Sequence, residues 1–319
     1  MPLTRRTFLQ STTATLAALA LPGCGATARK ECEACADDVL GWKISLAQWS
    51  LHRTFFGRDG YEKKDPLDFA AIAKGQFGIS ALEYVNQFYA EKKNDDAYLK
   101  DLKKRADDQG VKSVLIMCDR EGNLGDADDA KRTQAVENHV RWLEWAKTLG
   151  CHSIRVNAAS AGTWDEQVKL AADGLRKLSE KATTFGLNVI VENHGGLSSN
   201  GKWLAQVMTT VGLKNCGTLP DFGNFRTKKD PDEWYDRYQG VTELMPFAKG
   251  VSAKSHEFNE AGDEVRTDYR KMLKIVKAAG YKGHIGVEYE GSQLKEADGI
   301  IATKKLLENI FAEMRAAKA

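Results

Sequence analysis

The chain has 319 residues and is nearly neutral, with 46 Lys and Arg against 44 Asp and Glu. Two of the positive charges, Arg5 and Arg6, lie in the first 24 residues, which contain no acidic residue, so the rest of the chain has almost no net charge. A chain of this kind has no basic excess with which to bind a nucleic acid backbone or an anionic membrane. Its length beyond residue 40 allows one large domain or two small ones.

The first 24 residues read as a twin-arginine export signal. Arg5 and Arg6 precede an apolar run over residues 11–21, which is about half of the ~20 residues that a membrane-spanning helix needs. A membrane anchor is therefore the weaker alternative. Leu21-Pro-Gly-Cys24 resembles a bacterial lipoprotein cleavage box, and two fates stay open: a lipid anchor at Cys24, or release into the periplasm.

Residues 25–40 lack hydrophobic periodicity and are predicted to be a tether. Cys32 and Cys35 have the spacing of a zinc or redox pair, but no second Cys or His pair accompanies them. A local disulfide or an incidental pair is favoured over a metal site. Cys118, Cys151 and Cys216 occur singly near strand ends and are expected to be core thiols.

Beyond the tether, predicted strands alternate with predicted helices. The strands are expected at residues 43–49, 79–85, 111–117, 153–157, 187–192, 217–221, 250–254 and 284–288. The helices are expected at residues 66–76, 95–109, 126–149, 164–185, 202–211, 232–245, 269–279 and 295–315. Asp65 and Pro66 form a start signal for the first helix, and Gly186, Gly212 and Gly280 are stop signals for later ones.

Eight strand-helix pairs without a break in composition predict an α/β fold, a single (β/α)8 TIM barrel over residues 41–319. An open doubly wound sheet is the alternative. That fold favours a glycine-rich fingerprint after the first strand, and residues 48–52, Gln-Trp-Ser-Leu-His, are not one.

Four consecutive predicted strands end in residues that can bind a metal: Glu192, Asp221, His256 and Glu288. In such barrels the working residues lie at the C-terminal ends of strands, so these four are expected to converge. One acidic residue at a strand end could be a cap or a salt-bridge partner, but crowded carboxylates without a cation would repel one another. The set favours one divalent ion, Mn²⁺ or Mg²⁺, with Co²⁺ or Zn²⁺ as alternatives.

Four motifs carry a family resemblance: Val191-Glu-Asn-His194, Leu219-Pro-Asp-Phe-Gly223, Ala253-Lys-Ser-His256 and the closing segment over residues 280–291. Together they resemble the xylose isomerase-like TIM-barrel superfamily, the sugar phosphate isomerase/epimerase group. In ketose 3-epimerases of that group a matching set binds one divalent metal. The resemblance implies that Glu192 and Glu288 are metal ligands that also exchange the substrate proton, and that Asp221 and His256 complete the site.

Further strand-end residues are candidates for substrate contact. Arg155 and Asn157 are expected to meet sugar hydroxyls, and His194 or Lys254 to polarise the substrate carbonyl. For His194 the alternative is a residue that orients a ligand; for Lys254 it is a surface salt bridge. His52 and Asn86 are expected to act from loops, with a solvated loop as the alternative for His52.

The expected activity is that of a metal-dependent isomerase or epimerase that acts on a sugar or keto-sugar through proton abstraction and an enediolate. The same first step could serve a lyase or hydrolase of 3-keto-glycosides, which is the main alternative. A non-catalytic sugar-binding protein is less favoured. An apurinic endonuclease, which shares the superfamily, is disfavoured because the chain has six His and no basic excess. The expected partner is a small carbohydrate, and a homo-oligomer is compatible with the sequence.

Overall fold

The computed structural model describes residues 40–317. The predicted export signal, with Cys24, and the pair Cys32 and Cys35 therefore lie outside the described residues. Within residues 40–317, none of the helices combines the length and the apolarity needed to cross a bilayer. Cys118, Cys151 and Cys216 are buried and unpaired, as expected of core thiols.

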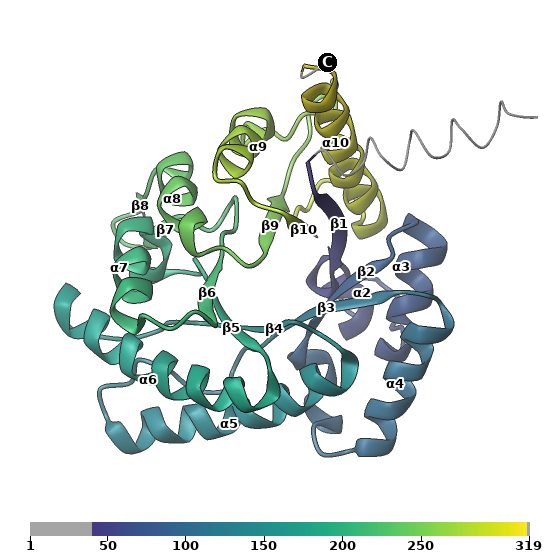
Figure 1. Ribbon diagram of the computed structural model, residues 1–319. Coiled ribbons are helices and arrows are strands. Elements are labelled where there is room, and N and C mark those ends of the chain that lie inside the picture. The colour runs from purple at the N-terminus through teal and green to yellow at the C-terminus, as the bar shows by residue number, and fades with distance from the viewer. Residues whose placement is uncertain (1–39, 318–319) are drawn as a thin grey trace, which may run out of the picture. The chain divides into compact units, whose positions relative to one another are not determined.

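Eight parallel strands form the centre of the described chain (Figure 1). They are β1 (Trp42–Ala47), β2 (Ala81–Val85), β3 (Lys112–Met117), β4 (Ser153–Val156), β5 (Asn188–Glu192), β6 (Cys216–Leu219), β9 (Val251–Ser255) and β10 (Gly283–Tyr289). The ladders run in the order β6-β5-β4-β3-β2-β1-β10-β9. Parallel bridges from Thr218 to Ala248 and from Asp221 to Ser252 join the two ends, so the sheet closes into the predicted barrel.

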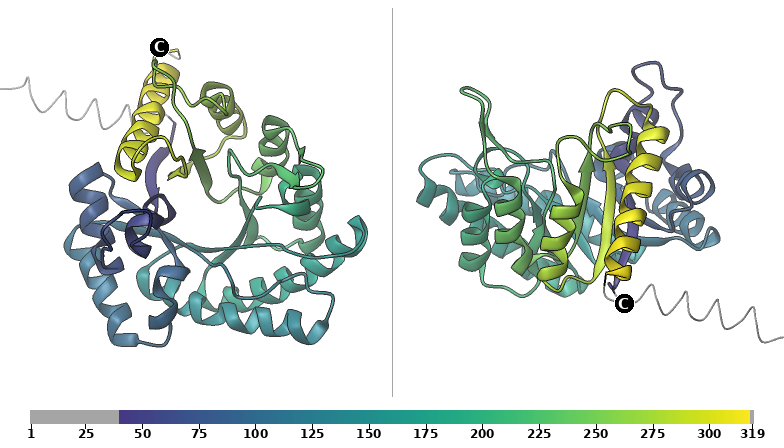
Figure 2. Two further views of the ribbon diagram at one scale, coloured as in Figure 1. Left: turned by 180° about the vertical axis from the view of Figure 1, so that it is seen from behind. Right: turned by 90° about the horizontal axis from the view of Figure 1, so that it is seen from above.

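The longer helices form a ring outside the strands (Figures 1 and 2). They are α3 (Phe69–Phe77), α4 (Asp96–Asp108), α5 (Asp129–Leu149), α6 (Trp164–Phe185), α7 (Gly201–Val211), α8 (Arg237–Leu244), α9 (Tyr269–Ala278) and α10 (Glu296–Ala316). Their starts follow local signals. Asp65 accepts a hydrogen bond from the backbone of Leu67 in the 3-10 turn η2 (Pro66–Asp68), and Thr163 and Glu166 form a capping box.

The structure differs from the sequence expectation in two segments at the C-terminal end of the barrel. A 3-10 turn, η1 (Gln48–Leu51), and the short helix α2 (His52–Phe56) follow the first strand, where a polar loop was expected. A hairpin of β7 (Arg226–Lys228) and β8 (Glu233–Trp234) takes up the start of the helix expected at 232–245. The hairpin strands are too short and polar to show a strand period. The other short turns are η3 (Asn86–Lys92), η4 (Gly196–Ser199) and η5 (Met245–Phe247).

Two apolar clusters hold the barrel together. The larger fills the space between strands and helices and includes Trp142, Trp145 and Trp203. The smaller contains strand residues such as Val114, Leu115, Met117, Ile190 and Leu219, which form the inner filling of a barrel. The strand ends beyond this inner filling are therefore rigidly supported.

One buried acid, Glu83 on β2, lies among these inward-facing residues. Its Oε1 accepts a hydrogen bond from Ser45 at 2.5 Å, and its Oε2 has no hydrogen-bond partner. Gly286 leaves room for it, since a Cβ there would lie 2.7 Å from both carboxyl oxygens. Burial, opposed by the Ser45 hydrogen bond and reinforced by Glu288 and Glu192, raises the pKa of Glu83 to about 8. The side chain is thus protonated at neutral pH.

Glu83→Gln is expected to stabilise the protein increasingly as pH rises. The unfolded Glu83 loses its proton near its ordinary pKa of 4.5 and the folded one near 8, so its contribution to stability is present below 4.5 and is lost as pH rises through 8. Glutamine has the shape of the neutral acid and does not titrate. Chemical denaturation in chelator at about pH 5 and about pH 8.5 should give a free energy of unfolding that is higher for the variant than for the wild type by a margin that grows with pH. A difference independent of pH would contradict the buried neutral acid.

Candidate metal centre and reaction cavity

Three carboxylates converge at the C-terminal end of the strands. Glu192 ends β5, Asp221 follows β6 by two residues, and Glu288 lies near the end of β10. Each offers an oxygen, and these oxygens all lie within 4.8 Å of one another. All three side chains are buried, with at most 2% of each residue exposed. The structure therefore brings together three of the four residues predicted as ligands.

Ser252 on β9 bridges two of these carboxylates. Its Oγ lies 2.8 Å from Asp221 Oδ2 and 2.8 Å from Glu288 Oε2. A hydroxyl has one proton to donate, so one of the two carboxyls must supply the other proton. The pKa shifts of both acids agree with this. Burial and the neighbouring carboxylates raise the pKa, and Lys254 lowers it by less. The net result is a pKa of about 7 for Asp221 and a raised pKa for Glu288.

The backbone fixes the remaining oxygen of Asp221. Its Oδ1 accepts hydrogen bonds from the backbone N–H groups of Gly223 and Asn224, both at 2.8 Å. The Asn224 side chain donates to Glu192 Oε1 at 2.8 Å, and Asn193 binds the backbone of Asp221 in both directions. The loop after β6 thus positions two of the three carboxylates.

Lys254 on β9 is the internal counter-ion of the cluster. Its Nζ lies 2.9 Å from Glu290 Oε2, 3.2 Å from Glu288 Oε1 and 4.0 Å from Asp221 Oδ2. Although burial opposes it, this set of carboxylates raises the pKa of Lys254 well above its ordinary value. Burial alone would raise the pKa of Glu290. The nearby Lys254 and the hydrogen bond from the indole N–H of Trp49 together have the larger effect and lower this pKa to about 2. Lys254 therefore faces the site rather than the surface.

Arg155 on β4 forms the second buried cation. Its Nη1 lies 2.8 Å from Asp119 Oδ1, and its Nε lies 2.8 Å from Glu192 Oε2 at an angle that makes no hydrogen bond. Asn157 also donates to Asp119, at 2.7 Å. These contacts with Arg155 and Asn157 outweigh burial and hold the pKa of Asp119 well below its usual range. Arg155 and Asn157 are thus organised by an acid that was not predicted.

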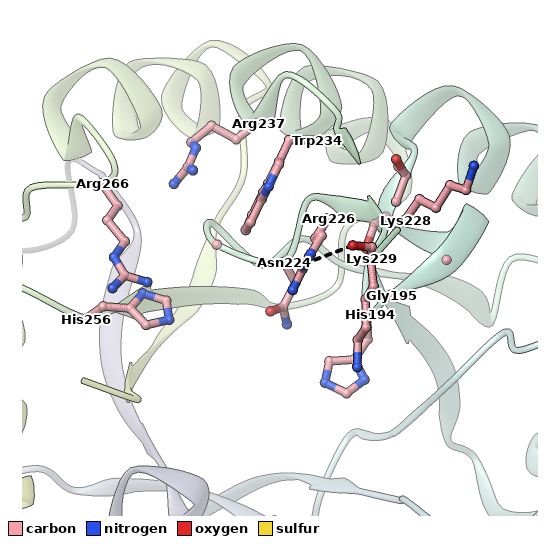
Figure 3. Close-up of a pocket in the computed structure, with 14 residues that line it drawn as sticks. His194, Gly195, Asn224, Arg226, Lys228, Lys229, Trp234, Arg237, His256 and Arg266 are labelled. Carbon is pink, nitrogen blue, oxygen red and sulfur yellow. Dashed lines mark hydrogen bonds between the residues drawn. The ribbon is translucent and has the colours of Figure 1, made fainter. Parts of the chain in front are cut away.

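His256, predicted as the fourth ligand, lies outside the cluster of ligand oxygens in the described residues. The strand register gives the reason. Lys254 pairs with Glu288, and Ser252 pairs with Asp221, so His256 is two residues, about 6.6 Å, beyond the level of Glu288. Its half-buried ring lines a neighbouring pocket beside Arg266 (Figure 3). Burial, with Arg266 and Lys254 nearby, lowers the pKa of His256 to about 4.

A cavity of about 300 Å³ opens beside the cluster, with Glu288 in its wall. Its walls include Trp49, Asp119, Arg120, Arg155, His194, Lys254, Glu288 and Glu290. Arg120 adopts a positive φ of 63°, an uncommon conformation for a side-chain-bearing residue. Three of the predicted substrate contacts, Arg155, His194 and Lys254, therefore line one cavity, and Asn157 does not line it.

The two residues predicted to contact the substrate from loops, His52 and Asn86, are held by other parts of the protein. The Nδ1 of His52 lies 2.8 Å from the carbonyl oxygen of Trp49 and 3.7 Å from Glu296, and its ring stacks on Trp49. Asn86 bonds both the N–H and the C=O of Asp119 and also reaches Glu121. Neither residue lines the reaction cavity. Asn86 acts on the site indirectly, because it holds the segment that contains Asp119.

Three site residues were missed in the sequence, namely Asp119, Ser252 and Asn224. Asp119 follows the end of β3 by two residues, as Asp221 follows β6, so the rule used for the other strands could have found it. Ser252 and Asn224 gave no such signal, because serine and asparagine are common in strands and turns of every kind.

The residues present fit a divalent cation. Besides Glu83, five buried or half-buried acids, Glu192, Asp221, Glu288, Glu290 and Asp119, surround two buried cations, Lys254 and Arg155. Glu192 Oε2 has no hydrogen-bond donor. Crowded acids of this kind are stabilised by a positive ion, and a purely oxygen donor set suits a hard one.

Comparisons with known proteins identify the fold and the family. No curated protein matches the chain in sequence. Among solved structures, the chain is similar to a D-tagatose 3-epimerase-like protein, with TM-score 0.65, 18% identity and coverage of 86% of this chain and 99% of that one. The chain is also similar to a 3-keto-D-glucoside 4-epimerase from E. coli, with TM-score 0.63, 15% identity and coverage of 84% of this chain and 99% of that one.

A xylose isomerase-like TIM barrel protein from Mycobacterium smegmatis, solved in complex with magnesium, gives TM-score 0.64 and 17% identity over 89% of this chain and 99% of that one. At sequence identities this low, the similarity to these solved structures establishes the fold alone. The family model described as xylose isomerase-like TIM barrel matches residues 69–310. With the match spanning most of the barrel, the chain belongs to the xylose isomerase-like TIM-barrel family.

Proposed function

We propose that this protein is a divalent-metal-dependent isomerase or epimerase that acts on a sugar or keto-sugar by moving a proton at the carbon next to a carbonyl. The observation that carries this proposal is the convergence of Glu192, Asp221 and Glu288 beside a cavity that Glu288 lines. The names of two structural neighbours, a D-tagatose 3-epimerase-like protein and a 3-keto-D-glucoside 4-epimerase, support it.

Glu192, Asp221 and Glu288 would hold the metal, with the Ser252 hydroxyl beside them. A bound divalent ion would supply positive charge next to the substrate oxygens and so favour loss of a proton from the adjacent carbon. Their oxygen donors favour Mn²⁺ or Mg²⁺ over thiophilic metals, with Co²⁺ or Zn²⁺ as alternatives. One structural neighbour was solved with magnesium and another with a zinc atom, so both ions occur in proteins of this fold.

Glu192 and Glu288 are the proposed proton carriers. They come from β5 and β10, two strands that β6 and β9 separate around the closed barrel, so their carboxylates reach the cluster from different strands. One would take the proton from carbon and the other would return it. Burial and the neighbouring carboxylates raise the pKa of Glu288, which favours the protonated form that returns a proton to carbon.

Lys254 and Arg155 are placed to stabilise negative charge on the substrate oxygen. Both are buried cations that line the cavity, and each is oriented by carboxylates on two sides. A fixed cation in a site from which water is largely excluded stabilises a developing oxyanion more than water would. Trp49, in the same wall, offers an aromatic face for a sugar ring.

A lyase or hydrolase of 3-keto-glycosides is the second candidate. A neighbouring pocket of about 480 Å³ shares His194 with the reaction cavity, so there is room for a group attached to the reacting ring. In that reaction the same proton is removed, the electron pair forms a carbon-carbon double bond, and the glycosidic oxygen leaves with its bonding pair and takes a proton.

Incubation with Mn²⁺ in deuterated water tests the proposal. A panel of free ketoses and 3-keto-glycosides is incubated and read by NMR and mass spectrometry. Deuterium at the carbon next to the carbonyl, with or without inversion, supports the isomerase or epimerase. Release of the aglycone from 3-keto-glycosides supports the lyase. Absence of exchange across the panel would count against both and leave a binding protein.

A further inference from the structure

A second pocket adjoins the reaction cavity and is lined by basic side chains. Loops after β5, β6 and β9, the β7–β8 hairpin and the start of α8 form its walls. His194 lines both spaces. Gly223 lies at their border, since a Cβ at this position would be 3.2 Å from the Lys254 side chain and 3.4 Å from the His256 ring.

The lining of this pocket contains five Arg and Lys side chains and no Asp or Glu. Figure 3 shows Arg237 and Trp234 along one wall, Arg266 above His256, and His194 on the opposite side. Three of the cations have acidic partners outside the lining: Arg226 with Asp232, Lys228 with Glu233, and Arg266 with Glu257. These partners leave part of the positive charge uncompensated.

Lys229 and Arg237 make no ion pair within the described residues. Arg237 is half-buried and donates to the Thr267 hydroxyl, which fixes the guanidinium without neutralising it. A guanidinium held in this way is well suited to bind a carboxylate, sulfate or phosphate through two parallel hydrogen bonds.

Trp234 adds an aromatic surface. It is 55% exposed, the one aromatic side chain among the large exposed apolar residues of the described chain. Its indole N–H bonds Asp232 at 3.1 Å, which orients the ring at the pocket wall. Aromatic faces of this kind pack against sugar rings, so the pocket combines a ring platform with cations.

We propose that this pocket is a subsite for the acidic part of a saccharide substrate. The reacting ring would lie over Glu192, Asp221 and Glu288, and a second sugar residue that bears a carboxylate, sulfate or phosphate group would lie between Trp234 and Arg237. The basic pocket attracts such a group, whereas the lining of the reaction cavity carries as many carboxylates as cations, so the acidic residue of the substrate binds in the pocket and sets one orientation. This inference rests on the proposed function for the identity of the reacting ring.

Calorimetric binding tests the subsite without any turnover. The probes are glucuronosyl-β-1,4-glucose and the neutral disaccharide cellobiose, with the full chain in the presence of Mn²⁺. The wild type is expected to bind the acidic disaccharide about tenfold more tightly, and about 0.5 M sodium chloride should reduce this preference. The affinities of sulfated and phosphorylated disaccharides show which of carboxylate, sulfate and phosphate binds most tightly. Tighter binding of any one of these acidic disaccharides than of cellobiose supports the subsite.

Arg237→Gln and Lys229→Gln are each expected to lose most of this preference. Lys274→Gln is the matched control, because Lys274 is an exposed cation on α9 without an ion pair. Two variants keep the test decisive if one folds poorly. Equal affinity of the wild type for acidic and neutral disaccharides, or full preference in both pocket variants, overturns the subsite. Failure of proton exchange alone overturns the proposed function and leaves this result standing.

Discussion

Glu288→Gln is expected to reduce proton exchange and turnover by a factor of about 10²–10⁴, the range contributed by a positioned acid or base. The substitution keeps the shape of the side chain and removes its ability to carry a proton. It also removes one of three carboxylates from the candidate metal centre, so the affinity for Mn²⁺ should fall as well.

The same substitution should leave the fold intact. Burial and neighbouring carboxylates already raise the pKa of Glu288, which means that its charged form is disfavoured in the metal-free protein. A neutral amide in its place relieves repulsion with Glu192, and Lys254 keeps Glu290 as its partner at 2.9 Å. The melting temperature without metal is therefore expected to stay the same or to rise.

Glu83→Gln is the matched control for this experiment. It makes the same chemical change at another buried glutamate of the barrel, but Glu83 is outside the ligand cluster and is protonated at neutral pH. Its turnover should remain close to that of the wild type. Wild-type exchange in Glu288→Gln, measured by deuterium incorporation, would remove Glu288 from the proposed mechanism.

The regular alternation of strand and helix segments along the sequence made the barrel predictable. Each strand-helix pair had its own local signals, such as Asp65 and Pro66 before α3 or Gly186 after α6, and closure followed from their number. The β7–β8 hairpin was not predictable in this way. Its strands are two and three residues long, and Trp234 packs at a pocket wall rather than in the core, so no periodic signal marks it.

The candidate site was predictable only as far as each strand end could be located. Glu192 ends an apolar strand and Glu288 is the penultimate residue of another, so their position along the barrel axis follows directly. His256 looked equivalent in sequence, yet its place depends on how β9 pairs with β10, and that register is a tertiary property. The same register puts Ser252, which gave no chemical signal, between Asp221 and Glu288.

Removal of divalent metal is expected to abolish exchange altogether, and Mn²⁺ or Mg²⁺ should restore it better than Zn²⁺. The donors in the cluster are carboxylate oxygens with a serine hydroxyl, and no described His or Cys joins them. Such a set favours hard ions. The measurement is exchange after treatment with chelator and after addition of each metal in turn. Activity undiminished by thorough chelation would refute the metal centre.

Metal binding should also release a proton and strengthen as pH rises through about 7. In the metal-free protein the Ser252 hydroxyl can donate to only one of two carboxyls, and the pKa of Asp221 is raised to about 7. A proton is therefore shared between Asp221 and Glu288 below that pH and competes with the cation. The number of protons released is measured by calorimetry of Mn²⁺ binding in buffers of different ionisation enthalpy, because the observed heat changes with the buffer in proportion to that number. In Glu288→Gln the count should fall, because the amide leaves Asp221 with the Ser252 proton and one fewer carboxylate to repel it.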